Sequence, residues 1–186
     1  MRTPRHAATA TAAAAVTALA LALAAGCGPS GAAGRPGPTP PGAPSTAPQT
    51  GAPDGPGGLV LTDVDVVEGD GSDRVVITFD GTGTPGWQAR YVDRPVVDGS
   101  GETPDLGGGA TLDVYASDTT WPAPGYYDGP ARLPTSTGGA VAASYVAGTF
   151  EGVTQVLVGL EGGPASYRVS TRTDPTRLVV EVDDPA

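Results

Sequence analysis

The sequence predicts an all-β protein, an antiparallel β-sandwich of about eight strands preceded by a disordered linker. From Leu59 onward, apolar and polar residues alternate with a period of two, which is typical of strands with one buried face. Turn-forming Gly-Gly, Asp-Gly and Asp-Pro pairs separate the alternating segments. No window of twelve or more residues in this part keeps a helical period. Short strands at such spacing indicate a sandwich or barrel.

Eight segments carry the alternating pattern. In the first, Val60, Thr62, Val64 and Val66 are predicted to share one face. The last two segments flank Asp174-Pro175-Thr176, which predicts a tight hairpin. The predicted strands lie in residues 60–66, 75–80, 86–97, 112–116, 141–147, 154–160, 167–172 and 178–182.

The residues before Leu59 have a different composition. Residues 28–58 consist mainly of Gly, Pro, Ala, Ser and Thr, with charges only at Arg35 and Asp54. Such a segment has too few apolar side chains to pack, and its prolines favour extended conformations. We therefore expect a disordered linker over residues 27–58 and the sandwich domain over residues 59–186.

Residues 1–26 have the three parts of a bacterial lipoprotein signal peptide. A short basic segment is followed by an apolar, alanine-rich segment and by small residues that lead into Cys27, the single cysteine. The pattern resembles a lipobox, although Ala24 stands where Leu is usual. The alternatives are a plain secretion signal and an uncleaved membrane helix. The lipoprotein interpretation predicts acylation at Cys27, palmitate included, and anchoring at the extracytoplasmic face of the cell membrane.

Composition excludes most catalytic chemistry. His6 is the only histidine and lies in the predicted signal peptide, so the mature chain has no Ser-His or Cys-His pair. It likewise has no histidine or free thiol for a zinc or copper site, and no disulfide. We expect no cofactor, no metal and no catalytic residues.

The charged residues bear on partners and source. All ten basic residues are arginines, which together with abundant Ala, Gly and Pro suggests a high-GC Gram-positive bacterium. From Leu59 onward, 19 acidic residues outnumber seven arginines. Such a surface repels nucleic acid, so no nucleic-acid partner is expected.

Three stretches resemble the AMIN-like domain of Gram-positive lipoproteins. They are Asp-Arg-Val-Val at residues 73–76, which leads into Trp-Gln-Ala-Arg-Tyr at 87–91, Phe-Glu-Gly at 150–152, and Asp-Pro-Thr-Arg-Leu-Val-Val at 174–180. The resemblance covers residues 59–184. It implies a small β-sandwich without established catalytic residues, which localises its partners in the cell envelope by binding peptidoglycan.

Two groups of residues are candidates for ligand binding. Trp121, Tyr126 and Tyr127 lie in a Pro- and Gly-rich loop, where they either stack on sugar rings or fold back over the edge of the sandwich. Arg168 and Arg172 share one strand face, where they either meet an anionic wall polymer or pair with acidic residues such as Glu181.

Clustered carboxylates give weaker signals. The segment from Glu68 to Asp73 has the oxygen ligands and glycines of a cation loop but lacks a closing bidentate Glu, so a hairpin turn is favoured. Asp63, Asp65 and Asp113 show no arrangement that assigns an acid and a nucleophile.

Three hypotheses for the function follow. The first is a non-catalytic envelope-localisation module that binds peptidoglycan or wall glycan, which an exposed aromatic groove would favour. The second is an accessory protein-interaction lipoprotein of a transport or wall-synthesis complex, which an exposed strand edge or apolar patch would favour. The third is a glycan hydrolase, which requires two carboxyl groups facing each other in a cleft.

Overall fold

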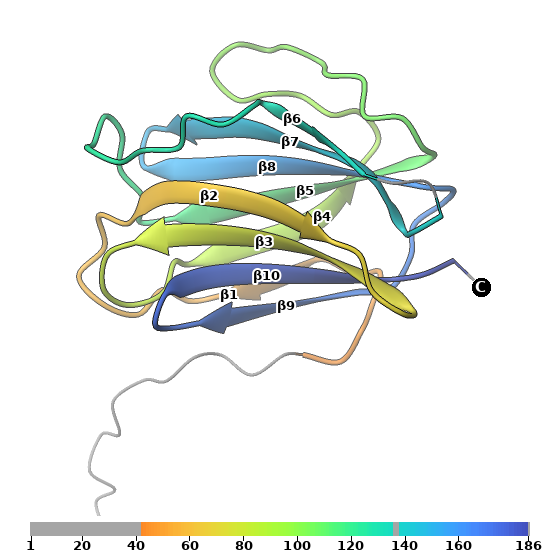
Figure 1. Ribbon diagram of the computed structural model, residues 1–186, viewed down its shortest axis with the longest axis horizontal. Helices are drawn as coiled ribbons and strands as arrows, with labels where there is room; N and C mark the ends of the chain where they lie inside the picture. The colour runs from red at the N-terminus through yellow and green to blue at the C-terminus, as the bar shows by residue number, and fades with distance from the viewer. Residues whose placement is uncertain (1–41, 136–137, 186) are drawn as a thin grey trace, which may run out of the picture. The chain divides into compact units, whose positions relative to one another are not determined.

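The computed structural model describes residues 42–135 and 138–185, which form two antiparallel β-sheets and contain no helix (Figure 1). The strand order is β1-β4-β5-β8-β7-β6 in the six-stranded sheet and β2-β3-β10-β9 in the four-stranded sheet. The six-stranded sheet contains β1 (Gln49–Gly51), β4 (Trp87–Val92), β5 (Ala110–Ser117), β6 (Arg132–Pro134), β7 (Val141–Phe150) and β8 (Val153–Leu160). The four-stranded sheet contains β2 (Val60–Val67), β3 (Ser72–Asp80), β9 (Tyr167–Arg172) and β10 (Thr176–Asp183). The predicted β-sandwich is confirmed.

The eight predicted strands correspond to β2–β5 and β7–β10. The structure adds β1 and β6, which have three residues each and are too short to show an alternating pattern. The predicted strand over residues 86–97 is too long, because β4 ends at Val92. Pro95, which has no N–H to donate, follows three residues later. Within the described ranges, no helix is long and apolar enough to span a membrane.

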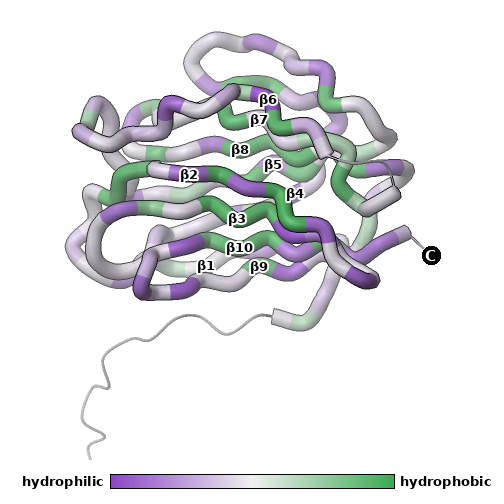
Figure 2. The backbone as a smooth tube through the Cα atoms, viewed as in Figure 1, coloured by the Kyte–Doolittle hydropathy of each residue, from purple (hydrophilic) through white to green (hydrophobic). Residues whose placement is uncertain are grey.

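The core lies between the two sheets. In β3, Val75, Ile77 and Phe79 are buried, whereas the intervening residues are more exposed. Leu178 of β10 is the register partner of Ile77 and is also buried. Figure 2 shows that hydrophobic residues concentrate in the strands. Burial of one face of each sheet explains the period of two in the sequence.

The predicted face of β2 is partly wrong. The register between β2 and β3 shifts between Leu61 and Asp63, which is a β-bulge. The extra residue brings Leu61 onto the buried face together with Val64. Strict alternation in the sequence predicted opposite faces for these two residues, because an alternating pattern does not show where a bulge adds a residue.

Residues 45–55, here called the strap, are attached to the sandwich. Ser45 exchanges two backbone hydrogen bonds with Tyr167 of β9, at 3.0 and 3.1 Å. β1 pairs with β4, and Asp54 exchanges hydrogen bonds of 3.0 and 2.7 Å with Thr84. The sequence placed these residues in the disordered linker. The structure differs because the pairing uses backbone groups, which leave no signature in side-chain composition.

Tyr167 binds the strap through its hydroxyl group and its backbone carbonyl. Its side chain is 0% exposed, and its hydroxyl lies 2.8 Å from the Ala47 carbonyl oxygen and 2.7 Å from that of Ala89. The Gln49 side-chain amide donates to the Tyr167 carbonyl oxygen at 2.8 Å. The strap thereby joins β9 of one sheet to β4 of the other.

At the opposite edge of the four-stranded sheet, the loop after β5 runs along the start of β2. Leu59 donates to the Asp118 carbonyl and accepts from the Thr120 N–H, and the Tyr127 N–H donates to the Leu61 carbonyl at 2.8 Å. Backbone groups at the beginning of this edge are therefore occupied. At the β9 edge of the same sheet, β9 and β10 form the predicted hairpin, with Arg172 and Arg177 in register.

Candidate functional site

A long loop, residues 93–109, joins β4 to β5 and packs on the outer face of the six-stranded sheet. Val97 and Leu106 contact the fully buried Leu157 of β8 and form a second, smaller hydrophobic cluster. The outer face of the sheet is therefore partly covered, and a hollow lies on each side of the covering loop.

Gln155 of β8 fixes this loop through polar contacts. Its amide nitrogen lies 3.0 Å from the Val96 carbonyl oxygen, and its amide oxygen accepts from the Asp98 N–H at 2.9 Å. The same nitrogen is 3.0 Å from Asp113 Oδ1 and 3.1 Å from the Tyr115 hydroxyl. The two N–H groups of the amide are thus shared among three acceptors.

The protonation of this network follows from its burial. Asp113 is only 4% exposed, and burial raises its pKa, while hydrogen bonds from Gln155 and Tyr115 and the charge of Arg90 oppose the shift. Burial, followed by the charges of Asp113 and Asp98, raises the pKa of Tyr115 well above its usual value. Tyr115 therefore keeps its proton at neutral pH.

A groove with a volume of about 840 Å³ opens beside this network. Its floor includes a polar row, Thr50 of β1, Gln88 of β4 and Tyr115 of β5, which are register partners on neighbouring strands. Alternation directs their side chains to the outer face, because the adjacent Trp87 and Ala89 belong to the core. Hydroxyl, amide and phenol groups thus stand side by side.

An exposed aromatic residue lines the same groove as the polar row. Phe150 ends β7, is 51% exposed and is the register partner of Val153, which in turn pairs with Ser117. Gly99 at the tip of the covering loop lies against its ring, since a Cβ at that position would be 3.1–3.3 Å from ring atoms. The groove therefore combines an apolar ring with hydrogen-bonding groups, as small-ligand sites do.

Charged groups line the same groove. Arg90, on the other side of the polar row, is exposed, and none of the described residues forms an ion pair with it. Asp98 and Glu151 supply negative charge. The groove can therefore receive a ligand that is mainly uncharged and carries a carboxylate near Arg90.

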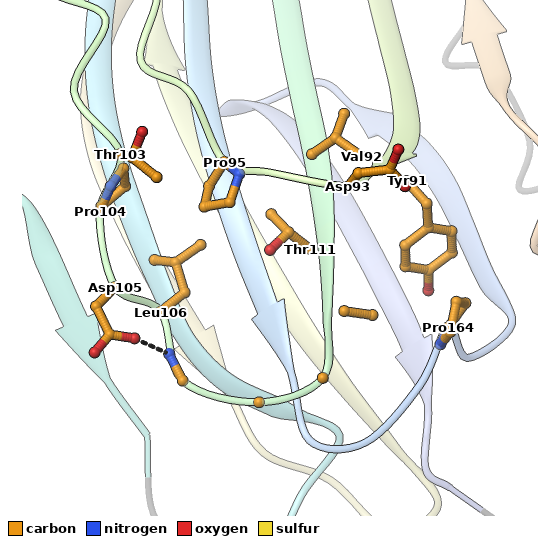
Figure 3. A pocket seen from close by; sticks show the side chains of 14 residues that line it. Tyr91, Val92, Asp93, Pro95, Thr103, Pro104, Asp105, Leu106, Thr111 and Pro164 are labelled. Atoms are coloured by element: carbon orange, nitrogen blue, oxygen red, sulfur yellow. Dashed lines mark hydrogen bonds between the residues drawn. The ribbon is translucent and has the colours of Figure 1, made fainter.

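The second hollow, of about 620 Å³, lies between the two ends of the covering loop (Figure 3). Two of its polar side chains, Tyr91 and Asp105, already have partners. The Tyr91 hydroxyl donates to the Ala165 carbonyl at 2.6 Å and accepts from the Ala165 N–H, and Asp105 accepts from the Gly107 N–H at 3.0 Å. None of the arginines that the structure describes lines it, so the groove on the other side of the loop is the better candidate.

The predicted aromatic residues divide into two groups. Trp121 is 61% exposed and meets Tyr126 edge to face. Tyr126 and Tyr127 fold back against the core, and the Tyr126 hydroxyl accepts from the Thr149 N–H at 2.8 Å. The two tyrosines therefore cover the edge of the sandwich, which is one of the two arrangements considered for this loop. The Trp121 indole stays exposed.

Of the predicted arginine pair, Arg168 forms ion pairs with neighbouring carboxylates. Arg168 lies 3.3 Å from Asp183 and 3.8 Å from Glu181, as the ion-pair alternative expected. Arg172 is exposed beside Arg177. Both predicted arginines are on β9, whereas the aromatic loop runs along β2 at the other edge of the sheet. The structure does not bring the two predicted groups together.

The predicted carboxylate clusters do not form a site in the described residues, where no group of three or more His, Cys, Asp or Glu residues is arranged to hold a metal. Asp73 is buried and its Oδ2 accepts from the Val141 N–H at 2.9 Å, so it links β3 to β7. Asp63 and Asp65 lie exposed on β2, whereas Asp113 lies on the outer face of the other sheet. These carboxylates therefore do not face one another.

The residues of the groove were not predicted as a site. Gln88, Arg90 and Phe150 lie in the stretches that carry the family resemblance, which was the available signal. Thr50 gave no signal, because it lies in the predicted linker. The predicted lipidation residue, Cys27, lies outside the described residues.

Comparison with known proteins places the chain in a family. The model of the AMIN-like domain family matches residues 59–184, which is more than half of the chain. The chain therefore belongs to the AMIN-like domain family. No curated protein and no solved structure matches it significantly. Membership indicates a non-catalytic module that is associated with the cell envelope or peptidoglycan.

Proposed function

We propose that this AMIN-like protein is a membrane-anchored, extracytoplasmic lipoprotein whose domain binds peptidoglycan or wall glycan without modifying it. One observation carries the proposal: the exposed ring of Phe150 and the polar row of Thr50, Gln88 and Tyr115 line the same open groove.

The groove matches the chemistry of a wall glycan. A sugar ring has an apolar CH face, which packs on an aromatic ring, and hydroxyl and amide groups at its rim, which need hydrogen-bond partners. Phe150 offers the first. Thr50 and Gln88 offer the second, together with the remaining lone pair of the Tyr115 hydroxyl, which accepts from Gln155 and donates to Asp113. Arg90 suits the carboxylates of peptide stems. The volume of about 840 Å³ lies within the range usual for small-ligand pockets.

The anchor is proposed from the sequence of the N-terminal region. Acylation of Cys27 would hold the chain at the outer face of the membrane of a high-GC Gram-positive bacterium. The chain from Cys27 to Ser45 reaches at most about 60 Å when fully extended. That reach would hold the groove in the wall layer next to the membrane.

The structure gives less support to an accessory protein-interaction role. Edge strands that bind partners are usually long and unobstructed. Here β1 and β6 have three residues each, and Ser45 and the loop after β5 bond to β9 and to the start of β2.

Co-sedimentation of the full-length protein, purified in mild detergent, with purified sacculi tests the proposal. We expect the wild type to pellet with sacculi and Phe150→Ala to bind about three- to tenfold more weakly, because it loses the stacking surface. Trp121→Ala is the matched control, since it removes another exposed aromatic residue, which does not line the groove. Loss of binding only in Trp121→Ala would move the site to the predicted aromatic loop. A wild type that stays in the supernatant would exclude wall binding and favour the accessory role.

A further inference from the structure

We infer that the strap, residues 45–55, is part of the ligand-binding groove, so that ligand binding and docking of the strap on β4 reinforce each other. This inference rests on the proposed function of the groove. Thr50, Gly51 and Pro53 line the groove, although they precede residue 59, where the family match begins. The tether that leads toward the proposed anchor therefore supplies one wall of the site.

The strap is held mainly by hydrogen bonds. β1 pairs with β4 over three residues only, and the other attachments are the backbone pairs of Ser45 and Asp54 and the hydrogen bonds of Tyr167 with Ala47 and Gln49. Thr50 and Pro53 are exposed. Short edge segments with few buried apolar contacts open at much lower free energy than the core strands. The strap can thus detach while the sandwich stays folded.

Gly51 of the strap lies close against the indole of Trp87. A Cβ at position 51 would overlap Nε1 and Cε2 of the Trp87 indole, so only glycine allows the strap to lie at this distance. The docked strap leaves Trp87 only 7% exposed. Any side chain at position 51 must push the strap away from β4 or displace the indole.

The polar row makes the strap and the ligand interdependent. Thr50 stands beside Gln88 and Tyr115 only when β1 is paired with β4. A ligand that contacts all three residues binds the docked state more tightly than the detached state. By thermodynamic linkage, the ligand must then stabilise docking by the same factor.

The test uses the full-length protein in detergent, purified sacculi and peptidoglycan fragments released by a muramidase. We expect Gly51→Val to bind sacculi at least about fivefold more weakly, because the wall with its hydrogen-bonding group is lost. Ala52→Val is the matched control, since Ala52 is exposed and does not line the groove. It should bind as the wild type does. In the wild type, the fragments should slow amide hydrogen exchange at residues 49–51.

Two further variants test whether the strap contributes to binding. Deletion of residues 45–55 removes the strap entirely, and Thr50→Val removes one hydroxyl while the strap stays docked. We expect the deletion to weaken binding as Gly51→Val does, and Thr50→Val to weaken it about threefold. Thermal unfolding shows whether each variant is folded. If Gly51→Val and the deletion do not fold, the binding of Thr50→Val tests the inference.

The outcomes separate the two proposals. If the wild type binds sacculi and the folded strap variants bind equally well, the inference is overturned while the proposed function stands. Unchanged exchange at residues 49–51 in the presence of the fragments would also overturn it. If the wild type does not bind, the proposed function fails and the inference fails with it.

Discussion

Replacing Tyr167 with Phe removes one hydroxyl group from the junction between the strap and the sandwich and leaves the aromatic ring in place. The hydroxyl lies 2.8 Å from the Ala47 carbonyl oxygen and 2.7 Å from that of Ala89. The side chain is fully buried, so water cannot take the place of the lost donor without rearrangement.

The expected destabilisation follows from this geometry. The hydroxyl has one proton, so it donates one hydrogen bond at a time to the two carbonyls. Loss of a buried donor that leaves an acceptor unpaired costs about 1–3 kcal/mol. For a domain of this size, a loss of about 2 kcal/mol lowers the melting temperature by roughly 5–8 °C.

Thermal unfolding of the two proteins at pH 7, followed by circular dichroism, measures the effect. Tyr127→Phe is the matched control, because the Tyr127 hydroxyl donates to the Pro130 carbonyl at the surface, where water can replace it. The control should change the free energy of unfolding by less than about 0.5 kcal/mol. Equal melting temperatures for Tyr167→Phe and the wild type would refute the role of this hydroxyl.

The Tyr167 hydroxyl also predicts how the stability of the domain changes at alkaline pH. Burial, with a smaller contribution from Tyr91, raises the pKa of Tyr167 from 10.0 to about 12. The folded state therefore keeps the proton when the unfolded state loses it. The stability from this group is complete below pH 10 and is lost as the pH rises toward 12. The difference in stability between wild type and Tyr167→Phe should thus shrink over this range, and a constant difference would contradict the assignment.

Two other predictions concern the anchor and the buried carboxylate. Cys27→Ala should abolish metabolic labelling with a palmitate analogue and shift protein to the medium or to an unprocessed precursor, and unchanged labelling would exclude lipidation at this residue. Because burial raises the pKa of Asp113 above 3.8, the stability that its protonated form contributes is present below pH 3.8 and is lost as the pH rises through the folded pKa. Asp113→Asn does not titrate, so its melting temperature relative to wild type should increase between pH 3.5 and pH 7, and parallel curves would contradict this reasoning.

The sequence by itself determined the class of fold and the eight long strands. Alternation along β3 and β10 is a local consequence of burying one face of a strand, so it appears in the sequence without knowledge of partners. The hairpin at Asp174-Pro175 was predictable for the same reason, since turn chemistry is local. From Leu59 onward the sequence has no histidine and no cysteine, so composition also excluded thiol and imidazole chemistry from the sandwich domain.

The tertiary structure alone decided how the candidate site is assembled. Thr50, Gln88 and Tyr115 become neighbours only through strand pairing between distant segments, and the pairing of β1 relies on backbone groups that every non-proline residue possesses. The ion pairs of Arg168 likewise depend on the neighbouring strand, because Arg168 meets Glu181 and Asp183 only in the folded sheet. Local pattern fixes which face a side chain occupies, whereas the neighbours on that face depend on strand order and register, which only the folded chain determines.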